Sequence, residues 1–465
     1  MKIRPKDIDI LHSEPFSNDL LNRKVEIENL SPILCNIDEP IVFAIDSPWG
    51  TGKTTFIKLW QKYLEGQNIS SIYFNAWESD FADDPLIAIV SQIDNWITSR
   101  ALYTTDKQIW TKAKSLLPGI AKSSVVAGVK LATLGALDLE KEVEKVVADL
   151  TSDVTEGLID NFNNKSESID EFKQLIGDVL SEVAGDQNNL IVFVDELDRC
   201  RPTYAIELLE RIKHLFSIDK LVFVLSTDLE QLSHSICAVY GSEFNSRKYL
   251  QRFVDLEYSL KKPENDAYIL NTFNSLGIND YLSKRKEGFH ETEELRKSFS
   301  FLARRFGLSL REVNLFLTRI RLILLSIPES TRLEGPLIVS LLILKKSNPV
   351  LYSKYVSDAG TADEVIEYFG ETLREEERFE DSFCYIAGAL IASSHAVEGG
   401  KRLQVLLTPY TEVSKEKAAH NTKRFIAASK IIGIASHVNG YRSAVNHKSC
   451  IEQLELFHRI NIFNS

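Results

Sequence analysis

The chain is poor in cysteine, glycine and proline for its 465 residues. Its 5 cysteines lie far apart in the sequence, at Cys35, Cys200, Cys237, Cys384 and Cys450. Because their number is odd and no pair has the spacing of a metal site, the sequence predicts neither a cysteine metal site nor a disulfide framework. The 21 glycines and 13 prolines are scattered, so we expect no long disordered linker between domains.

The sequence also lacks a hydrophobic segment long enough to span a membrane. Its first residues, MKIRPKDIDILHSEPF, contain no apolar signal-peptide core. The best candidate, residues 123–139, has only 17 residues and is interrupted by Lys130, whereas a span needs about 20. We therefore expect no membrane span, a cytoplasmic location, and a buried or interfacial helix over residues 123–139.

The net charge of −12 argues against a protein built to coat nucleic acid. The charge is uneven, because residues 401–465 hold 10 Lys and Arg against 4 Glu, while residues 358–381 are strongly acidic. Two interpretations stay open for these segments. They are solvated helix faces, or docking surfaces for an acidic partner or nucleic acid.

Four short runs are apolar almost throughout, as is typical of strands buried on both faces of a parallel sheet. They are IVFAID (41–46), SSIYFNAW (70–77), NLIVFVDE (189–196) and KLVFVLST (220–227). A helical pattern follows each of the first three, which predicts an α/β fold with a parallel sheet. Residues 98–187 and the chain beyond about 260 show helical patterns only. We expect a helical insertion and a helical C-terminal domain there.

The stretch IVFAIDSPWGTGKTTFIKLW (41–60) matches a phosphate-binding loop between a strand and a helix. Gly50 and Gly52 let the backbone curl around phosphates, Lys53 reaches the β- and γ-phosphates, and Thr54 coordinates Mg²⁺. The predicted nucleotide-binding residues are Ser47, Pro48, Trp49, Gly50, Thr51, Gly52, Lys53, Thr54 and Thr55.

This loop departs from the usual pattern at one position, because Ser47 stands where the first glycine is expected. Serine is small, its hydroxyl could contact phosphate, and Pro48 fixes the next φ angle. We interpret the loop as able to bind nucleotide, with the catalytic rate left in question.

An apolar strand ending in Asp195 and Glu196 predicts the second half of an NTPase site. Asp195 is the expected Mg²⁺ ligand, and Glu196 the group that orients and deprotonates the attacking water. Asp198 either shares that role or makes a salt bridge or cap. At the end of the next strand, Thr227 or Asp228 is the candidate γ-phosphate sensor, with Ser226 behind them; a plain strand-ending turn is the alternative.

Four motifs, in this order, resemble the KAP-family P-loop NTPases: SPWGTGKTTF, FNAWESDFADDPL, VFVDELDRCRP and FVLSTDLEQLSHSI. The earlier DLLNRKVEIENLSPIL and the later RKYLQRFVDLEYSL and LSLREVNLFLTRI are also similar to elements of that family, over residues 16–325. The family is related to the signal-transducing STAND ATPases. It includes animal membrane scaffold proteins and a plasmid-encoded phage-exclusion protein.

The resemblance implies ATP as the nucleotide, a five-stranded core and a helical lid. Many members carry membrane helices in the interval where this chain has its mostly polar insertion, so we expect a soluble insertion here. The resemblance also implies a lid arginine at Arg311 that contacts the γ-phosphate, and an arginine acting on a neighbouring subunit at Arg247 or Arg252. Ordinary surface ion pairs are the alternative for each.

These observations predict two halves of an NTPase core (1–97 and 188–260), a helical insertion (98–187), and a helical lid with a C-terminal helical domain (261–465). The leading hypothesis is a Mg²⁺-dependent ATP hydrolase that acts as a conformational switch. We expect it to form a homo-oligomer, and its candidate biological role is defence against phage or plasmids. One alternative is a scaffold locked to ATP with little turnover. Another is a regulatory ATPase subunit that needs an effector protein, and a small-molecule kinase is weaker.

Overall fold

The computed structural model describes residues 10–11, 13–82, 84–99, 104–121, 152–184, 189–261, 265–285, 288–328, 333–357, 359–371, 373–394, 401–415, 422–440 and 447–458. The chain divides into two compact units, one of Ile8–Lys262 and the other containing Pro263–Ser465. The segment 123–139, for which we predicted a buried or interfacial helix, lies outside the described residues.

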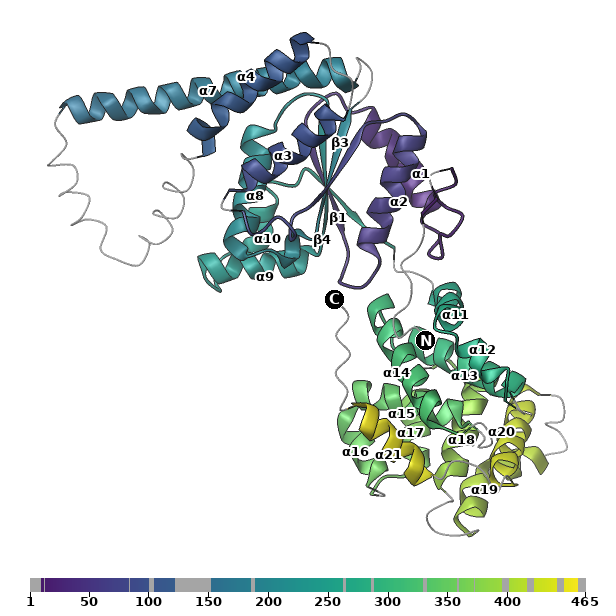
Figure 1. Cartoon of the computed structure of the whole chain (residues 1–465). Coiled ribbons are helices and arrows are strands. Elements are labelled where there is room, and N and C mark those ends of the chain that lie inside the picture. The colour runs from purple at the N-terminus through teal and green to yellow at the C-terminus, as the bar shows by residue number, and fades with distance from the viewer. Residues whose placement is uncertain are drawn as a thin grey trace. The chain divides into compact units, whose positions relative to one another are not determined.

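The first unit is built on a five-stranded parallel sheet with the strand order β2-β3-β4-β1-β5 (Figure 1). The strands are β1 (Ile41–Asp46), β2 (Ser71–Asn75), β3 (Leu190–Asp195), β4 (Leu221–Thr227) and β5 (Leu256–Ser259). This arrangement confirms the α/β fold predicted from the apolar runs. The individual strand β5 was not predicted, because it is a mostly exposed edge strand without an apolar run.

Helices cover both faces of this sheet (Figure 1). On one face α1 (Lys24–Cys35) and α2 (Lys53–Gly66) pack against alternate strand residues, with Trp60 fully buried against Phe193. The other face is covered by α3 (Pro85–Thr98), α8 (Pro202–Leu215) and α9 (Leu229–Tyr240). A 3-10 turn, η2 (Leu197–Arg199), follows β3, and the short α10 (Ser246–Leu250) precedes β5. The sheet is thus buried on both sides, as parallel sheets are.

The described parts of the insertion are two helices that lie side by side, α4 (Thr104–Ala121) and α7 (Ser152–Ala184) (Figure 1). Their apolar residues, including Trp110 and Phe172, are buried in the same hydrophobic core as α3 and α8. The insertion therefore extends the core of the first unit. None of the helices in the described ranges is long and apolar enough to cross a membrane.

The second unit is helical throughout its described residues. Its helices are α11 (Asn265–Ser275), α12 (Ile278–Leu282), α13 (Gly288–Arg305), α14 (Leu310–Ser326), α15 (Gly335–Ser347), α16 (Pro349–Val356), α17 (Ala362–Gly370), η3 (Glu377–Phe379), α18 (Asp381–Ser394), α19 (Lys401–Lys415), α20 (Lys423–Gly440) and α21 (His447–His458). Helix α15 is apolar on all sides and buried from Gly335 to Leu344, so it forms the centre of this unit.

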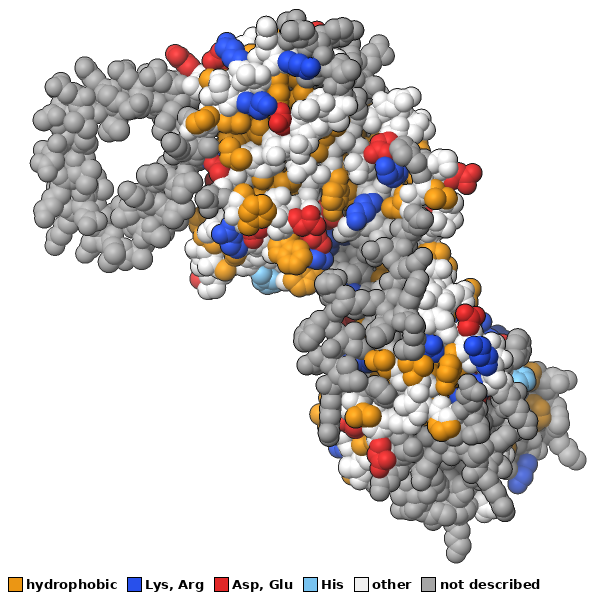
Figure 2. Space-filling view, viewed as in Figure 1, with side chains coloured by type: hydrophobic (Ala, Val, Ile, Leu, Met, Phe, Trp, Pro, Cys, Tyr) orange, Lys and Arg blue, Asp and Glu red, His pale blue; other side chains and the backbone are white. Residues whose placement is uncertain are grey.

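Both signs of charge are mixed on the face of the first unit seen in Figure 2. Lys and Arg side chains there lie among Asp and Glu side chains, and hydrophobic side chains lie between them. A nucleic-acid-binding face usually presents a basic patch or stripe instead.

Candidate functional site

The phosphate-binding loop runs from the end of β1 to the start of α2. Gly50 has φ 79° and Gly52 has φ 90°, backbone conformations that glycine adopts easily and other residues rarely do. Gly52 is the residue before α2, and the helix begins at Lys53. The loop therefore leads directly into a helix N-terminus, where free N–H groups and the helix dipole favour an anion.

Ser47 is compatible with this loop. It is buried and is not among the described residues with a positive φ angle, so its position does not require glycine. Its hydroxyl donates to Thr51 Oγ1 at 2.7 Å, and the Thr51 hydroxyl donates to the Pro48 carbonyl at 2.9 Å. The serine that replaces the expected glycine thus forms a hydrogen bond within the loop, to a residue four positions later.

We expect Ser47→Gly to change ATP affinity by no more than about fivefold, because one neutral hydrogen bond contributes only about 1 kcal/mol. Gly52→Ala is the comparison variant, since a side chain at φ 90° is strained. It is expected to weaken binding clearly more than Ser47→Gly. Calorimetric titration with ATP measures both, and a larger loss in Ser47→Gly would contradict this view of the loop.

The Lys53 ammonium group folds back over the loop. Its Nζ donates to the carbonyl oxygens of Ser47 and Pro48. Burial lowers the pKa of Lys53, and four nearby carboxylates oppose that effect. In order of decreasing influence they belong to Asp198, Asp228, Asp195 and Asp46. The structure therefore brings the loop together with the acidic ends of β1, β3 and β4.

Asp195 is the last residue of β3 and is held by the neighbouring strand β2. Its Oδ2 accepts a hydrogen bond from the Tyr73 hydroxyl at 3.1 Å, and its Oδ1 accepts one from the Glu196 N–H at 3.0 Å. Burial and the carboxylate of Asp195 together raise the pKa of Tyr73, so the phenol stays a donor at neutral pH. Tyr73 thereby fixes the orientation of the Asp195 carboxylate.

The donor set suits Mg²⁺ that is held mainly by phosphate. The part of the chain that the structure describes has no group of three or more His, Cys, Asp or Glu side chains able to cage a metal. Mg²⁺ usually takes one or two carboxylates, substrate phosphates and water rather than an all-protein cage. Asp195 and the half-buried Thr54 could supply such protein donors.

Glu196 has φ 61°, a left-handed conformation that is uncommon for a residue other than glycine. Its Oε1 pairs with Nη1 of Arg199 at 2.7 Å, and its Oε2 accepts a hydrogen bond from Nδ2 of Asn75 at 3.2 Å. Asn75 is the last residue of β2, which lies at the edge of the sheet beside β3. The carboxylate is therefore held toward β2.

Asp198 contacts the phosphate-binding loop instead. Its Oδ2 accepts hydrogen bonds from the Trp49 indole at 2.5 Å and from the Asp228 N–H at 3.1 Å. Burial raises the pKa of Asp198, and the nearby Lys53 opposes that effect most. Asp198 thus links the loop to the turns after β3 and β4.

Thr227 ends β4 beside the end of β1, and its carbonyl accepts a hydrogen bond from the Ser47 N–H at 3.3 Å. The hydroxyls of Thr227 and Ser226 are fully buried and have no hydrogen-bond partner among the described residues. Asp228 instead caps α9 by accepting from the Gln231 N–H. Both residues therefore keep a hydroxyl without a partner in the described ranges, and Thr227 is the one whose backbone also bonds to the loop.

The model of the KAP family P-loop domain matches residues 23–326. The chain belongs to the KAP family. This confirms the resemblance that the sequence motifs indicated, and with it a nucleotide-binding P-loop domain.

Two solved structures are also similar to this KAP chain. The ORC2 protein of Aeropyrum pernix, in ADPNP-ADP complexes, is 13% identical, with coverage of 90% of this chain and 94% of that one and a TM-score of 0.29. PCH-2 of C. elegans is 13% identical, with 70% and 66% coverage and a TM-score of 0.24. No curated protein matches the chain.

The KAP entry motif DLLNR contains a buried arginine, Arg23, that contacts the phosphate-binding loop. Arg23 is 1% exposed; its Nη2 donates to the Thr51 carbonyl at 3.3 Å and its Nη1 to the Lys261 carbonyl at 2.7 Å. Nη1 also pairs with Glu26 at 2.8 Å, and Glu26 accepts from the Tyr258 hydroxyl. Arg23 therefore joins the phosphate-binding loop to the chain that leaves β5.

We expect Arg23→Ala to lower the free energy of unfolding by about 3 kcal/mol, because it leaves the nearly buried Glu26 without its cation. Lys24→Ala is the control at the next residue, since the Lys24 ammonium makes an exposed pair with Glu28 and lies 6.0 Å from the centre of the Phe16 ring. Its expected cost is below about 0.5 kcal/mol. Urea denaturation measures both, and equal midpoints would contradict the structural role of Arg23.

None of the loop contacts described above involves the three arginines that the KAP resemblance singled out. Arg311 is an exposed residue near the start of α14 in the second unit. Nη2 of Arg247 donates to both carboxylate oxygens of Glu257 at 2.7 Å, and the Arg252 guanidinium lies over the Tyr249 ring. Their roles at a nucleotide stay predictions.

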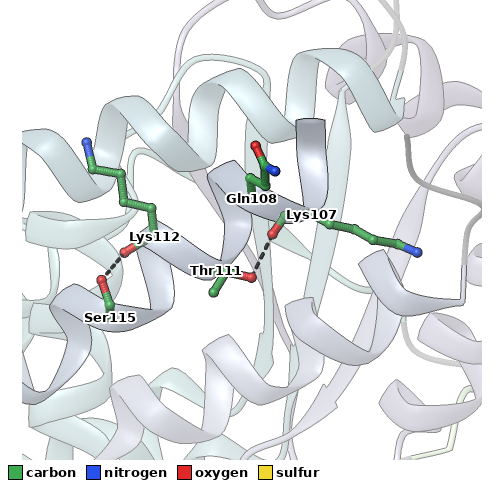
Figure 3. Close-up of a pocket in the computed structure, with 5 residues that line it drawn as sticks. All are labelled: Lys107, Gln108, Thr111, Lys112 and Ser115. Atoms are coloured by element: carbon green, nitrogen blue, oxygen red, sulfur yellow. Dashed lines mark hydrogen bonds between the residues drawn. The ribbon is translucent and has the colours of Figure 1, made fainter. Parts of the chain in front are cut away.

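A pocket of about 460 Å³ lies on the insertion, along α4 (Figure 3). The hydroxyls of Thr111 and Ser115 that line it donate to backbone carbonyls of α4 itself, and Lys112 pairs with Glu171 of α7. Figure 3 shows Lys107 and Lys112 extending in different directions. We assign no ligand to this pocket.

The sequence motifs did not identify the side chains that hold the two acids. Tyr73 and Asn75 contact Asp195 and Glu196 across the β2–β3 pair, and their only sequence signal is the polar alternation at the end of an otherwise apolar run. Arg199, in the turn after β3, pairs with Glu196, and no sequence pattern indicated this pair. Each of these contacts depends on which strand lies beside β3.

Proposed function

We propose that this KAP chain binds ATP with Mg²⁺ at residues 47–55 and hydrolyses it. The observation that carries the proposal is the position of Lys53. Its ammonium group bonds to the Ser47 and Pro48 carbonyls of the loop. Burial lowers its pKa, and the carboxylates of four aspartates at or just after the ends of β1, β3 and β4 raise it. A phosphate-binding loop beside the acidic end of an apolar strand is the arrangement that Mg²⁺-dependent nucleotide hydrolysis requires.

In this proposal the loop N–H groups and Lys53 bind the β- and γ-phosphates, and Thr54 and Asp195 hold Mg²⁺. The metal ion supplies charge neutralisation between the phosphates. Glu196 accepts a proton from the attacking water while the water oxygen bonds to the γ-phosphorus. The bond from that phosphorus to the ADP oxygen then breaks, giving ADP and phosphate. The Thr227 hydroxyl donates to the γ-phosphate and so distinguishes ATP from ADP.

We further propose that the nucleotide state acts as a conformational switch. Arg23 supports this idea, because it bonds both the loop at Thr51 and the chain at Lys261, just before the second unit. Assembly into a homo-oligomer, contact of Arg311 with the γ-phosphate, contact of Arg247 or Arg252 with a neighbouring subunit's nucleotide, and an effector partner belong to the same proposal. A role in defence against phage or plasmids, and a cytoplasmic location, rest on the family resemblance and the sequence.

A second candidate function is a scaffold that binds ATP with little turnover. One observation favours it: both carboxylate oxygens of Glu196 are already engaged, by Arg199 and Asn75. A general base must instead reach the attacking water.

Hydrogen exchange tests the switch. Glu196→Gln with ATP is compared with the same variant with ADP, over residues 19–26 and 258–261. Different protection of both segments in the two states is the expected result. Identical protection, at saturating concentrations of both nucleotides, would rule out coupling through Arg23. Sedimentation of the same samples measures oligomer formation.

A further inference from the structure

The contacts of Glu196 hold its carboxylate toward the β2 edge of the sheet, away from β1, the strand that leads into the phosphate-binding loop. Arg199 and Asn75 hold its two oxygens at 2.7 and 3.2 Å. Asn75 belongs to the edge strand β2, whereas the loop follows β1, on the other side of β3 and beyond β4. Asp198, in the same turn, reaches the loop through Trp49. The two acids of this turn therefore face opposite ways.

Arg199 is itself held by an aromatic ring. Its guanidinium carbon lies 5.6 Å from the centre of the Trp77 ring, within the range of a cation–π interaction. Trp77 is 52% exposed, and it lies in the loop between β2 and α3. The Asn75 side chain accepts hydrogen bonds from the N–H groups of Trp77 and Glu78, both at 3.1 Å. One loop therefore positions both groups that contact Glu196.

The same loop is anchored to the segment after β3 at a third point. Arg201 Nε donates to Oδ1 of Asp80 at 2.8 Å, and the Arg201 N–H donates to Oδ2 of Asp80 at 2.9 Å. Residues 75–82 and the turn of residues 196–201 are thus joined at three points, by Asn75 with Glu196, Trp77 with Arg199 and Asp80 with Arg201. Trp77 is therefore linked to Glu196 through Arg199.

We propose that Arg199 is a positioning residue that restrains Glu196 on the β2 side, and that the Trp77 ring keeps Arg199 in place. The inference rests on the proposed function, because it concerns the group that would deprotonate water. In the contacts described above, neither Arg199 nor Trp77 bonds to the phosphate-binding loop. Releasing the restraint therefore raises turnover and leaves ATP affinity unchanged.

Steady-state ATP hydrolysis tests this with Arg199→Ala, Trp77→Ala and the double variant. Each is expected to raise kcat by about fivefold, the scale of one partly exposed ion pair, with KM unchanged. The double variant is expected to equal the single ones, because both act through one contact. Adding Glu196→Gln to Arg199→Ala removes the gain. Lys62→Ala is the matched control, since Lys62 pairs with Glu65 at the same spacing and the same 2.7 Å, away from the site.

A lower kcat or a higher KM in Arg199→Ala, with an active wild type, overturns the restraint and leaves the hydrolysis proposal standing. Tryptophan emission tests the contact without turnover: Arg199→Ala shifts the emission, and the shift is lost in a Trp77→Phe background. Without such a shift the inference fails. If the shift is seen but neither the wild type nor any variant hydrolyses ATP, the hydrolysis proposal fails together with the restraint, and only the stacking contact stands.

Discussion

Lys53→Ala is expected to weaken ATP binding by at least about 100-fold, because it removes the charged partner of the phosphates inside a partly buried site. The surroundings of Lys53 enlarge the effect. The carboxylates of four aspartates act on its ammonium group, so without the lysine their negative charge would no longer be offset by this cation when a triphosphate binds. Calorimetric titration of ATP in the presence of Mg²⁺ measures the change.

Lys62→Ala is a suitable control for this experiment, since Lys62 lies on the same helix and pairs with Glu65. Its ATP affinity is expected to match that of the wild type. Unchanged affinity in Lys53→Ala would place the nucleotide somewhere other than the loop of residues 47–55. Thermal unfolding of each variant without nucleotide shows whether the fold is retained.

Glu196→Gln is expected to lower ATP turnover by about 10²–10⁴-fold, the usual contribution of a general base, while ATP still binds. Glutamine keeps the size of the side chain and its acceptor oxygen, so the contacts to Arg199 or Asn75 are only partly lost. Phosphate release and ATP titration on one preparation separate the two effects.

Asp198→Asn distinguishes the two acids of the turn after β3. Asparagine can still accept from the Trp49 indole and the Asp228 N–H, so the loop stays linked to the turn. We expect a small loss of turnover compared with Glu196→Gln. The reverse order, with turnover lost in Asp198→Asn and kept in Glu196→Gln, would assign the base role to Asp198.

The sheet was predictable from the sequence because its inner strands are buried on both faces. Such strands must be apolar throughout, which is why the runs at residues 41–46, 189–196 and 220–227 indicated β1, β3 and β4. Strand β5 was missed for the opposite reason. Its residues are mostly exposed, and it pairs in parallel with β1 at the edge of the sheet.

The phosphate-binding loop was predictable because its chemistry lies in consecutive residues. The glycines with positive φ, the lysine and the threonine all fall within residues 50–54. Contacts between distant residues were not predictable. Arg23 reaches Thr51, and Tyr73 reaches Asp195 across 122 positions, and only the order of strands and helices in the fold determines these pairs.

Ser47 illustrates the limit of a motif. The usual glycine predicts a backbone conformation that a side chain would obstruct, yet Ser47 is not among the described residues with positive φ, and it bonds to Thr51. Whether a substitution is tolerated depends on the local φ angle and the available partners. The serine is therefore compatible with nucleotide binding.

Phosphate release from ATP by the wild-type chain, with Mg²⁺ and with excess EDTA, tests the central proposal most directly. Glu196→Gln run alongside sets the background. We predict turnover that needs Mg²⁺ and falls to background in Glu196→Gln. Turnover that persists in EDTA or in Glu196→Gln, or tight ATP binding with no turnover at any protein concentration, would contradict hydrolysis by this site.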